Sequence, residues 1–483
     1  MPRNILLVEI NEITWDLIDP LIAAGKLPAF ARLKREGTWG TPISVDLPPQ
    51  LDPWITWTTL YTGRTQDAHN VFFLQQPPES IKARRMWEIC ADEGLSVGVY
   101  GSICSWPPRP VNGFYVPDTF SPDASTYPAS LEPIQQLNLT YTRTVRLPAD
   151  HDTLGFKMRM AWKLMNLGLG PAAMTAIAKQ LGSEALDKTG RWRRVALQPM
   201  VNFQFFSKLY RKHRPRYASF HTNHVAHYQH TYWKAMQPDK FRPIETTEQE
   251  QKIYGKAIEY GYESADRLLA GMMGLLDGNT VLVVASSMGQ KPYISNLEGG
   301  KQVQQLRSHD KLLEILGVKG EARAVATMSD EFNIYADSRE VRDRIYESMR
   351  AAWVVEPGKA IFHLERIENA IRCNLRIYGT KEVKHDSPLC FPLAPGAPTM
   401  AYEDLIYNTG HLKSGCHDPR GMAIFYGAGV PRGVEMREYN NLDFAPTFLE
   451  ILGLPPRAEM TGKVMSEVTG AARTDAARMT AAR

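Results

Sequence analysis

The sequence lacks the patterns that mark several common classes of protein. Its five cysteines, Cys90, Cys104, Cys373, Cys390 and Cys416, are scattered, and no two of them form a CxxC pair. This distribution argues against a disulfide framework or a cysteine-bound zinc, so we interpret the cysteines as free thiols in a reducing cytoplasm. No apolar run has the length of a membrane span, and no signal peptide precedes the first predicted strand. A net charge of +4 is too small to indicate a nucleic-acid partner.

The patterns that are present predict an α/β protein. With 483 residues, the chain is long enough for one large α/β domain with insertions, or for two domains. Residues 5–10 form an apolar run and a helical pattern follows over residues 15–22, which predicts a buried parallel strand leading into a helix. Ligands of such sheets bind at the carboxyl ends of the strands, where this sequence has Glu9, Asn11 and Glu12. The alternative is a strand end whose polar residues simply meet solvent.

A proline-bounded loop at residues 48–54 precedes a second segment of interest. Residues 55–61 read as a helix that ends at Gly63. Asp52 should therefore lie at the start of this helix, where free amides and the dipole favour a charged carboxylate by about 0.3–1 kcal/mol. A carboxylate stabilised in this way is a weak general base, but it can act as a nucleophile or a metal ligand. It can equally be a plain helix cap.

Histidines gather in residues 220–233, which contain four of the twelve in the chain. If this segment is helical, Asn223 and His227 share a face, and so do His227 and His230. Histidines at this spacing suit a metal or an anionic ligand. The alternative is a polar helix face with aromatic neighbours.

The rest of the chain suggests how the domains are arranged. Buried strands are predicted at residues 280–285 and 422–426, and shorter strands at 332–335 and 376–378 suggest a smaller appended unit. We expect a core formed by residues 1–130 and 199–467. The expected additions are a small subdomain at about 330–400, a helical insertion or lid at 131–198, and a flexible tail at 468–483.

Five of these segments resemble the alkaline phosphatase superfamily, in its type I phosphodiesterase and nucleotide pyrophosphatase branch. They are the opening strand with Thr14-Trp15-Asp16, the segment from Pro48 to Asn70, Pro107 to Gly113, Ser414 to Gly429, and the run from Asp443 to Pro455. The resemblance implies a mostly parallel sheet with helices on both faces. It also implies two divalent metals between a nucleophilic Thr or Ser and a set of Asp and His ligands.

The sequence departs from the family pattern at most of the implied ligands. Asn11 stands where the family has a metal-binding Asp, and Asp52 stands at the nucleophile, although Thr56 remains an alternative. The remaining positions are occupied by Asn223 and His227, by Ser287-Met288-Gly289, and by His417. Because most of these replacements are neutral, they cannot offset the charge of two zinc ions. We therefore expect at most one divalent ion (zinc, magnesium or manganese), held by His227 and His417.

Two functions remain open at this stage. The first is an atypical hydrolase or transferase acting on a phospho-ester, a sulfo-ester or a sugar nucleotide. By analogy with the family, this activity could belong to bacterial surface-polysaccharide biosynthesis. The second is a pseudoenzyme that binds a phosphorylated glycan, a nucleotide or a partner protein without turnover. A homo-oligomer is compatible with both. In either case we expect Asp52 and His227 to be the catalytic positions and the ligand-binding side chains to be Glu9, Asn11, Glu12, Asn223, His224, His230, Ser287 and His411.

Overall fold

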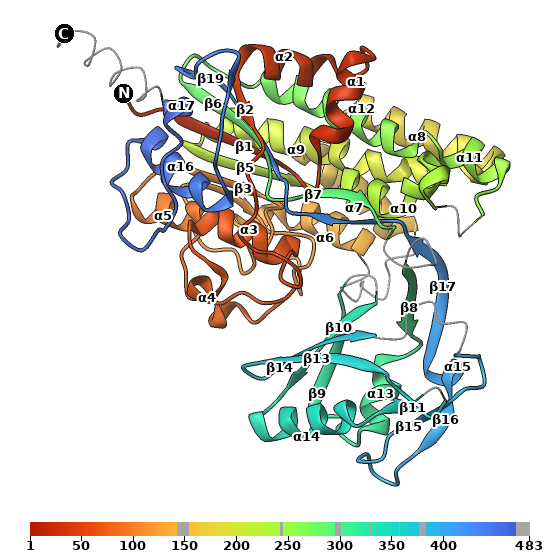
Figure 1. Cartoon of the computed structure of the whole chain (residues 1–483). Helices are drawn as coiled ribbons and strands as arrows, with labels where there is room; N and C mark the ends of the chain where they lie inside the picture. Colours follow the sequence, from red (N-terminus) through yellow and green to blue (C-terminus); the bar gives the residue numbers. More distant parts are fainter. Residues whose placement is uncertain are drawn as a thin grey trace.

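The computed structural model describes residues 1–142, 154–241, 245–294, 301–327, 330–356, 358–375 and 383–469 (Figure 1). An eight-stranded sheet forms its centre, with the strand order β20-β2-β19-β6-β1-β5-β3-β4. In that order, the strands are Val434–Glu435, Thr38–Gly40, Met422–Gly427, Thr280–Ser286, Asn4–Ile10, Tyr217–Thr222, Val97–Tyr100 and Gly113–Val116. Strand β1 pairs in parallel with β5 and β6, whereas β19 runs antiparallel to β6 and β2.

Helices cover both faces of this sheet because the side chains of its strands alternate. In β1, Leu6 and Val8 belong to one apolar cluster, and Ile5 and Leu7 belong to another. The first cluster includes α1 (Trp15–Ala23), α2 (Pro28–Glu36), α9 (Leu197–His213), α10 (His224–Met236) and α12 (Ala257–Met273). The second includes α3 (Pro53–Thr62), α5 (Met86–Asp92) and α16 (Phe444–Leu452). The predicted α/β class, with a mostly parallel sheet and helices on both faces, is confirmed.

A smaller subdomain with its own apolar core extends from this sheet (Figure 1). One of its sheets has the order β13-β14-β10-β9, and a second has the order β12-β11-β15-β16. These strands are Phe362–Ile367, Ala370–Leu375, Glu331–Ala336 and Ala322–Ala326, then Lys359–Ala360, Trp353–Val354, Pro388–Cys390 and Thr399–Ala401. Its helices are α13 (His309–Ile315), α14 (Arg339–Arg350) and α15 (Tyr402–Leu405). The strand predicted at residues 332–335 lies in β10, and the strand predicted at 376–378 lies outside the described residues.

Two paired strands lead from the core to the subdomain. Strand β8 (Lys301–Leu306) pairs antiparallel with β17 (Ile406–Lys413), and nearer the core β7 (Gly289–Pro292) pairs with β18 (Gly415–Asp418). Figure 1 shows the long β17 running between the two parts of the molecule. We refer to β8 and β17 together as the ribbon.

The remaining described helices lie around the core. They are α4 (Gln66–His69), α6 (Glu132–Thr142), α7 (Leu154–Leu167), α8 (Pro171–Leu186), α11 (Glu248–Tyr254) and α17 (Ser466–Thr469). Short 3-10 turns lie at Pro78–Ser80, Ala129–Leu131, Lys188–Ala196, Pro238–Phe241 and Asn441–Asp443. Of the tail predicted from residue 468, only Val468 and Thr469 are described, and both belong to α17. Among the described residues, no helix is long and apolar enough to span a membrane.

The glycine that ends α3 allows a test of how this helix is held. Gly63 adopts the left-handed conformation, with φ of 61°, and a Cβ there would lie 3.1 Å from the Cβ of Ala445. Gly94 has φ of 74° with open space around it. We expect Gly94→Ala to cost about 1 kcal/mol of unfolding free energy from backbone strain alone. Gly63→Ala should lower the unfolding free energy by more than this, because the new Cβ would also press against Ala445 of α16. Equal losses for the two variants in urea unfolding would contradict this packing.

Candidate functional site

The candidate site lies at the carboxyl end of β1, where Asn11 and Glu12 follow the strand. Both side chains are buried, with exposed fractions of 2% and 1%. Glu12 has φ of 62°, a conformation that is uncommon for residues other than glycine. Strained backbone of this kind concentrates at functional sites. The carboxylate of Glu12 is therefore the natural starting point for describing the site.

Two histidines from different elements face the Glu12 carboxylate. Nε2 of His230, on α10, lies 2.9 Å from Oε2, and Nε2 of His417, on β18, lies 3.6 Å from Oε1. Gln290 donates from its side-chain amide to Oε2, and the Asn11 amide donates to Oε1 over 2.9 Å. Both carboxylate oxygens are thus engaged by neighbours from three other parts of the chain.

In each histidine, the hydrogen bond made by Nδ1 determines the tautomer of the ring. The tautomer in turn determines whether Nε2 presents a proton or a lone pair to Glu12. Nδ1 of His417 lies 2.7 Å from the carbonyl of Leu51, and Nδ1 of His230 lies 3.2 Å from the carbonyl of Gly415. Because a carbonyl only accepts hydrogen bonds, Nδ1 carries the proton in each ring. A neutral ring then presents the lone pair of Nε2 toward the carboxylate. Metal-binding histidines are oriented in the same way by backbone carbonyls.

The environment of this group keeps Glu12 charged and His417 neutral. Burial opposes the charge of Glu12, but the adjacent His230, together with the Gln290 amide, holds the pKa of its carboxyl well below the usual range. Burial lowers the pKa of His417 to about 4, against the opposing effect of Glu12. Near neutral pH, Glu12 and Nε2 of His417 are therefore two acceptors that face each other.

One divalent ion fits this arrangement. The ligand atoms of Glu12, His230 and His417 all lie within 4.8 Å of one another. Two ligand atoms of a single tetrahedral zinc lie roughly 3.4 Å apart. The distances from the Glu12 oxygens to Nε2 of His230 and of His417, 2.9 and 3.6 Å, lie on either side of this value. Two imidazoles and one carboxylate also form a common catalytic zinc set with an open fourth position. His227 does not belong to this group.

The residues beside this group do not fit the second ion that the family pattern implies. Thr56 and Ser287 bond directly to each other through their hydroxyls, 2.8 Å apart. Asn11 accepts from the indole of Trp57 over 2.8 Å and donates to Asn223 over 2.8 Å, in addition to its bond to Glu12. All these side chains are neutral apart from Glu12, and the Asn11 amide hydrogens point toward its oxygen neighbours. A second cation would have to break this network without gaining a carboxylate.

Asp52 caps α3 as expected, but its charge state differs from the expectation. Its carboxylate accepts from the amide of Trp54 over 2.9 Å. Burial nevertheless raises the pKa of Asp52, and the charge of Arg372 and the Trp54 amide only partly offset this effect. The sequence-based prediction that the helix end would dominate is therefore wrong. The reason is burial next to the small subdomain, whose Glu331 has a pKa raised mainly by burial and further by Asp52.

The other predicted site residues have different environments. Glu9 is fully buried and accepts hydrogen bonds from Tyr61, Ser102 and His221, which places it in a network beneath the site. His224 is buried and bonded to Thr222. Asn223 and His227 are both exposed at the start of α10. His411 belongs to β17, and its side chain lies outside what the structure describes.

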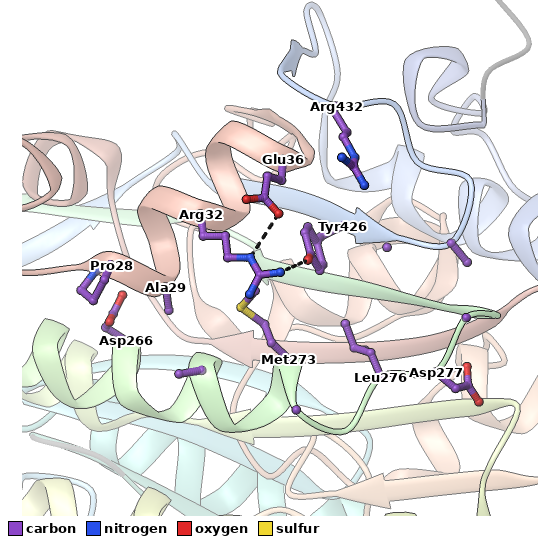
Figure 2. Close-up of a pocket in the computed structure, with 15 residues that line it drawn as sticks. Pro28, Ala29, Arg32, Glu36, Asp266, Met273, Leu276, Asp277, Tyr426 and Arg432 are labelled. Carbon is purple, nitrogen blue, oxygen red and sulfur yellow. Dashed lines mark hydrogen bonds and ion pairs between the residues drawn. The ribbon is translucent and has the colours of Figure 1, made fainter.

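Two cavities lie away from the Glu12 group. Figure 2 shows one of about 660 Å³ between α2, α12 and the end of β19, where Arg32 bonds to Glu36 and Tyr426. It opens at the amino ends of the parallel strands, whereas ligands of such sheets bind at the carboxyl ends. The other, of about 510 Å³, lies between the segment from Pro49 to Lys82 and the β13–β14 hairpin, and Arg372 lines it. This second cavity is the one near Asp52.

Several site residues could not be recognised from the sequence. Gln290 and Trp57 carry no local signal, because each reaches the site through the fold. Arg372 comes from the small subdomain, more than 300 positions after Asp52 in the sequence. His230 is predicted from the sequence as a ligand-binding residue, but not as a partner of Glu12. The φ of Glu12 also has no signature in its residue type.

The chain was compared with family models, curated protein sequences and solved structures. No family model and no curated protein sequence matches the chain. Among solved structures, the chain is similar to phosphonoacetate hydrolase from Sinorhizobium meliloti 1021, with 16% identity, a TM-score of 0.43, and coverage of 94% of this chain and 96% of that one. It is also similar to human ectonucleotide pyrophosphatase/phosphodiesterase 5, with 11% identity, a TM-score of 0.42, and coverage of 96% and 99%.

Two histidines near the site elements lead to a prediction about acid stability. Burial lowers the pKa of His69 and of His224 to about 3. Below about pH 6.5 the unfolded chain protonates these rings while the folded protein does not. Stability should therefore decrease as the pH falls, by up to about 1.4 kcal/mol per pH unit for each ring.

The variant His224→Asn removes one of these rings. Its loss of unfolding free energy between about pH 7 and about pH 5, measured in urea, should be smaller than that of the natural protein. His385 is 88% exposed, so His385→Asn serves as the control and should leave the loss unchanged. An unchanged loss in His224→Asn would show that the ring is protonated in the folded state.

Proposed function

We propose that this protein is a metal-dependent hydrolase of phosphate esters that uses one divalent ion. The observation that carries the proposal is the orientation of His230 and His417, whose Nδ1 atoms bond to backbone carbonyls while their Nε2 atoms face the Glu12 carboxylate. These three side chains would hold the ion. An ion held there supplies a Lewis acid for a phosphoryl oxygen.

The chain's own residues supply the remaining parts of a hydrolytic site. Asp52 has a raised pKa, which makes it a better base than an ordinary carboxylate, and it can also act as a nucleophile. Arg372 and Lys413 are positive charges close enough to act on Asp52. Arg372 is paired with Glu331 and Glu365, so the attraction of an anionic substrate to this carboxylate would come mainly from Lys413. His227 is exposed on α10 and takes no part in this assignment.

A second function is favoured by the neutral network around Asn11. Because Thr56 and Ser287 satisfy each other, the position of a second ion is closed. A protein with this arrangement can bind a phosphorylated ligand without turnover. A sulfo-ester, a sugar nucleotide or a glycan intermediate of surface-polysaccharide synthesis remains compatible with both functions as the ligand.

The metal proposal is tested by elemental analysis of the purified protein after exposure to zinc. We expect one tightly bound ion per chain and its loss in His230→Ala, because that change removes one of three ligands. His227→Ala is the matched control on the same helix and should retain the ion. Retention of zinc in His230→Ala, or two ions per chain, would contradict the assignment.

The activity is tested with p-nitrophenyl phosphate and bis(p-nitrophenyl) phosphate on the zinc-loaded protein. We expect Asp52→Asn to lower kcat by roughly 100-fold or more, since it removes the base or nucleophile. The thermal midpoint should change little, because Asn caps helices about as well as Asp. Full activity in this variant would mean that Asp52 is only a cap. Binding of inorganic phosphate with no hydrolysis of either ester would support binding without turnover instead.

A further inference from the structure

Helix α7 has apolar side chains on two opposite sides. Met160, Leu164 and Leu167 pack against the core, with Leu164 buried. Met158, Trp162 and Met165 follow the same spacing of four and three residues on the opposite side, with exposed fractions of 63%, 67% and 48%. An exposed tryptophan between two exposed methionines is unusual for a solvated helix. We refer to Met158, Trp162 and Met165 as the stripe, and we expect it to be covered by a binding partner.

Helix α8 follows α7 after a short connection and also has exposed apolar residues. Met174 and Leu181 are 41% and 49% exposed, and Leu186, at its end, is 92% exposed. The side facing the core is formed by Ala173 and Ile177. The connection is fixed to α9, because the Gly170 amide bonds to Gln204 and Lys208 bonds to the carbonyl of Asn166. Both helices are therefore anchored on one side while they present apolar residues on another.

Basic residues outnumber acidic ones in this region, whose acidic residues are Glu184 and the exposed Asp187. Residues 154–183 contain four basic residues and no acidic residue. The four are Lys157, Arg159, Lys163 and Lys179. The following turn adds Lys188, Arg191, Arg193 and Arg194, all exposed. The first acidic residue, Glu184, is buried and paired with Arg194.

We propose that α7 and α8 form a surface that binds an anionic lipid bilayer. Helices with an apolar stripe, a basic polar side and an exposed tryptophan lie in the plane of the membrane interface, with the apolar side among the lipid headgroups. Lysines and arginines beside the stripe are attracted to anionic lipids. The helices have 14 and 16 residues and do not span a bilayer. They therefore rest on its surface.

The charge and the apolar stripe of this surface favour an anionic bilayer over two other partners, a second copy of the chain and a nucleic acid. If the same surface on a second copy of the chain were the partner, basic residues would face basic residues, which opposes pairing. A nucleic acid would satisfy the basic residues but leave the stripe of Met158, Trp162 and Met165 in water. A bilayer of anionic lipids satisfies both properties. The assignment is independent of the chemistry at Glu12.

The test is co-sedimentation of the full chain with two kinds of vesicle, one of phosphatidylcholine and one of equal parts phosphatidylcholine and phosphatidylglycerol. We expect binding to the anionic vesicles to be at least tenfold stronger. It should weaken at about 0.5 M salt, where charges are screened over a few ångströms. Trp162→Ala should lower the partition coefficient at least tenfold. The same change at Trp353, which is 46% exposed in the small subdomain, should have no effect.

Three results would overturn the proposal. The first is no binding to either vesicle. The second is equal loss of binding in the variants at Trp162 and Trp353. The third is a dimer of the free protein that Trp162→Ala converts to monomer, measured by light scattering, because the stripe would then be an interface between copies. Thermal unfolding of each variant establishes that the fold is retained, and Met158→Gln provides a second variant on the same stripe.

Discussion

The site depends on a buried carboxylate that follows the first strand of the sheet. Glu12 stands in a left-handed backbone conformation and is reached by side chains from α10, β7 and β18. A buried charge is costly unless it is paired and hydrogen-bonded. The position of α10 and of the β7–β18 pair against the sheet is therefore tied to this one group. The same requirement makes the group suitable for a cation.

The residues beside Glu12 form an ordered network of neutral side chains. The Asn11 amide bonds to Trp57, Asn223 and Glu12, so one neutral side chain connects these parts of the chain. Thr56 and Ser287 connect α3 to the end of β6 through one hydrogen bond between their hydroxyls. Because these side chains are neutral, the network is stable without a cation. A set of carboxylates at the same positions would need a cation to offset their charge. Arg372 and Lys413 act on the charge of Asp52, and Arg372 is itself paired with Glu331 and Glu365.

The sequence predicted the parts of the structure that depend on local patterns. The first strand, the cap at Asp52 and the left-handed Gly63 follow from apolar periodicity and turn chemistry, and each is present. The sequence pattern assigned the ion to His227 and His417, whereas the group around Glu12 contains His230, because the outcome depends on how α10 is rotated against β18. The pKa of Asp52 was also out of reach, since it depends on burial beside a subdomain that follows much later in the chain.

The ribbon of β8 and β17 has a mechanical consequence. Its strands continue toward β7 and β18, which carry Gln290 and His417, and both of these side chains contact Glu12. On the β17 side only Ser414 separates the ribbon from the strand that carries His417. A change in the orientation of the small subdomain would therefore have a short covalent route to the carboxylate of Glu12.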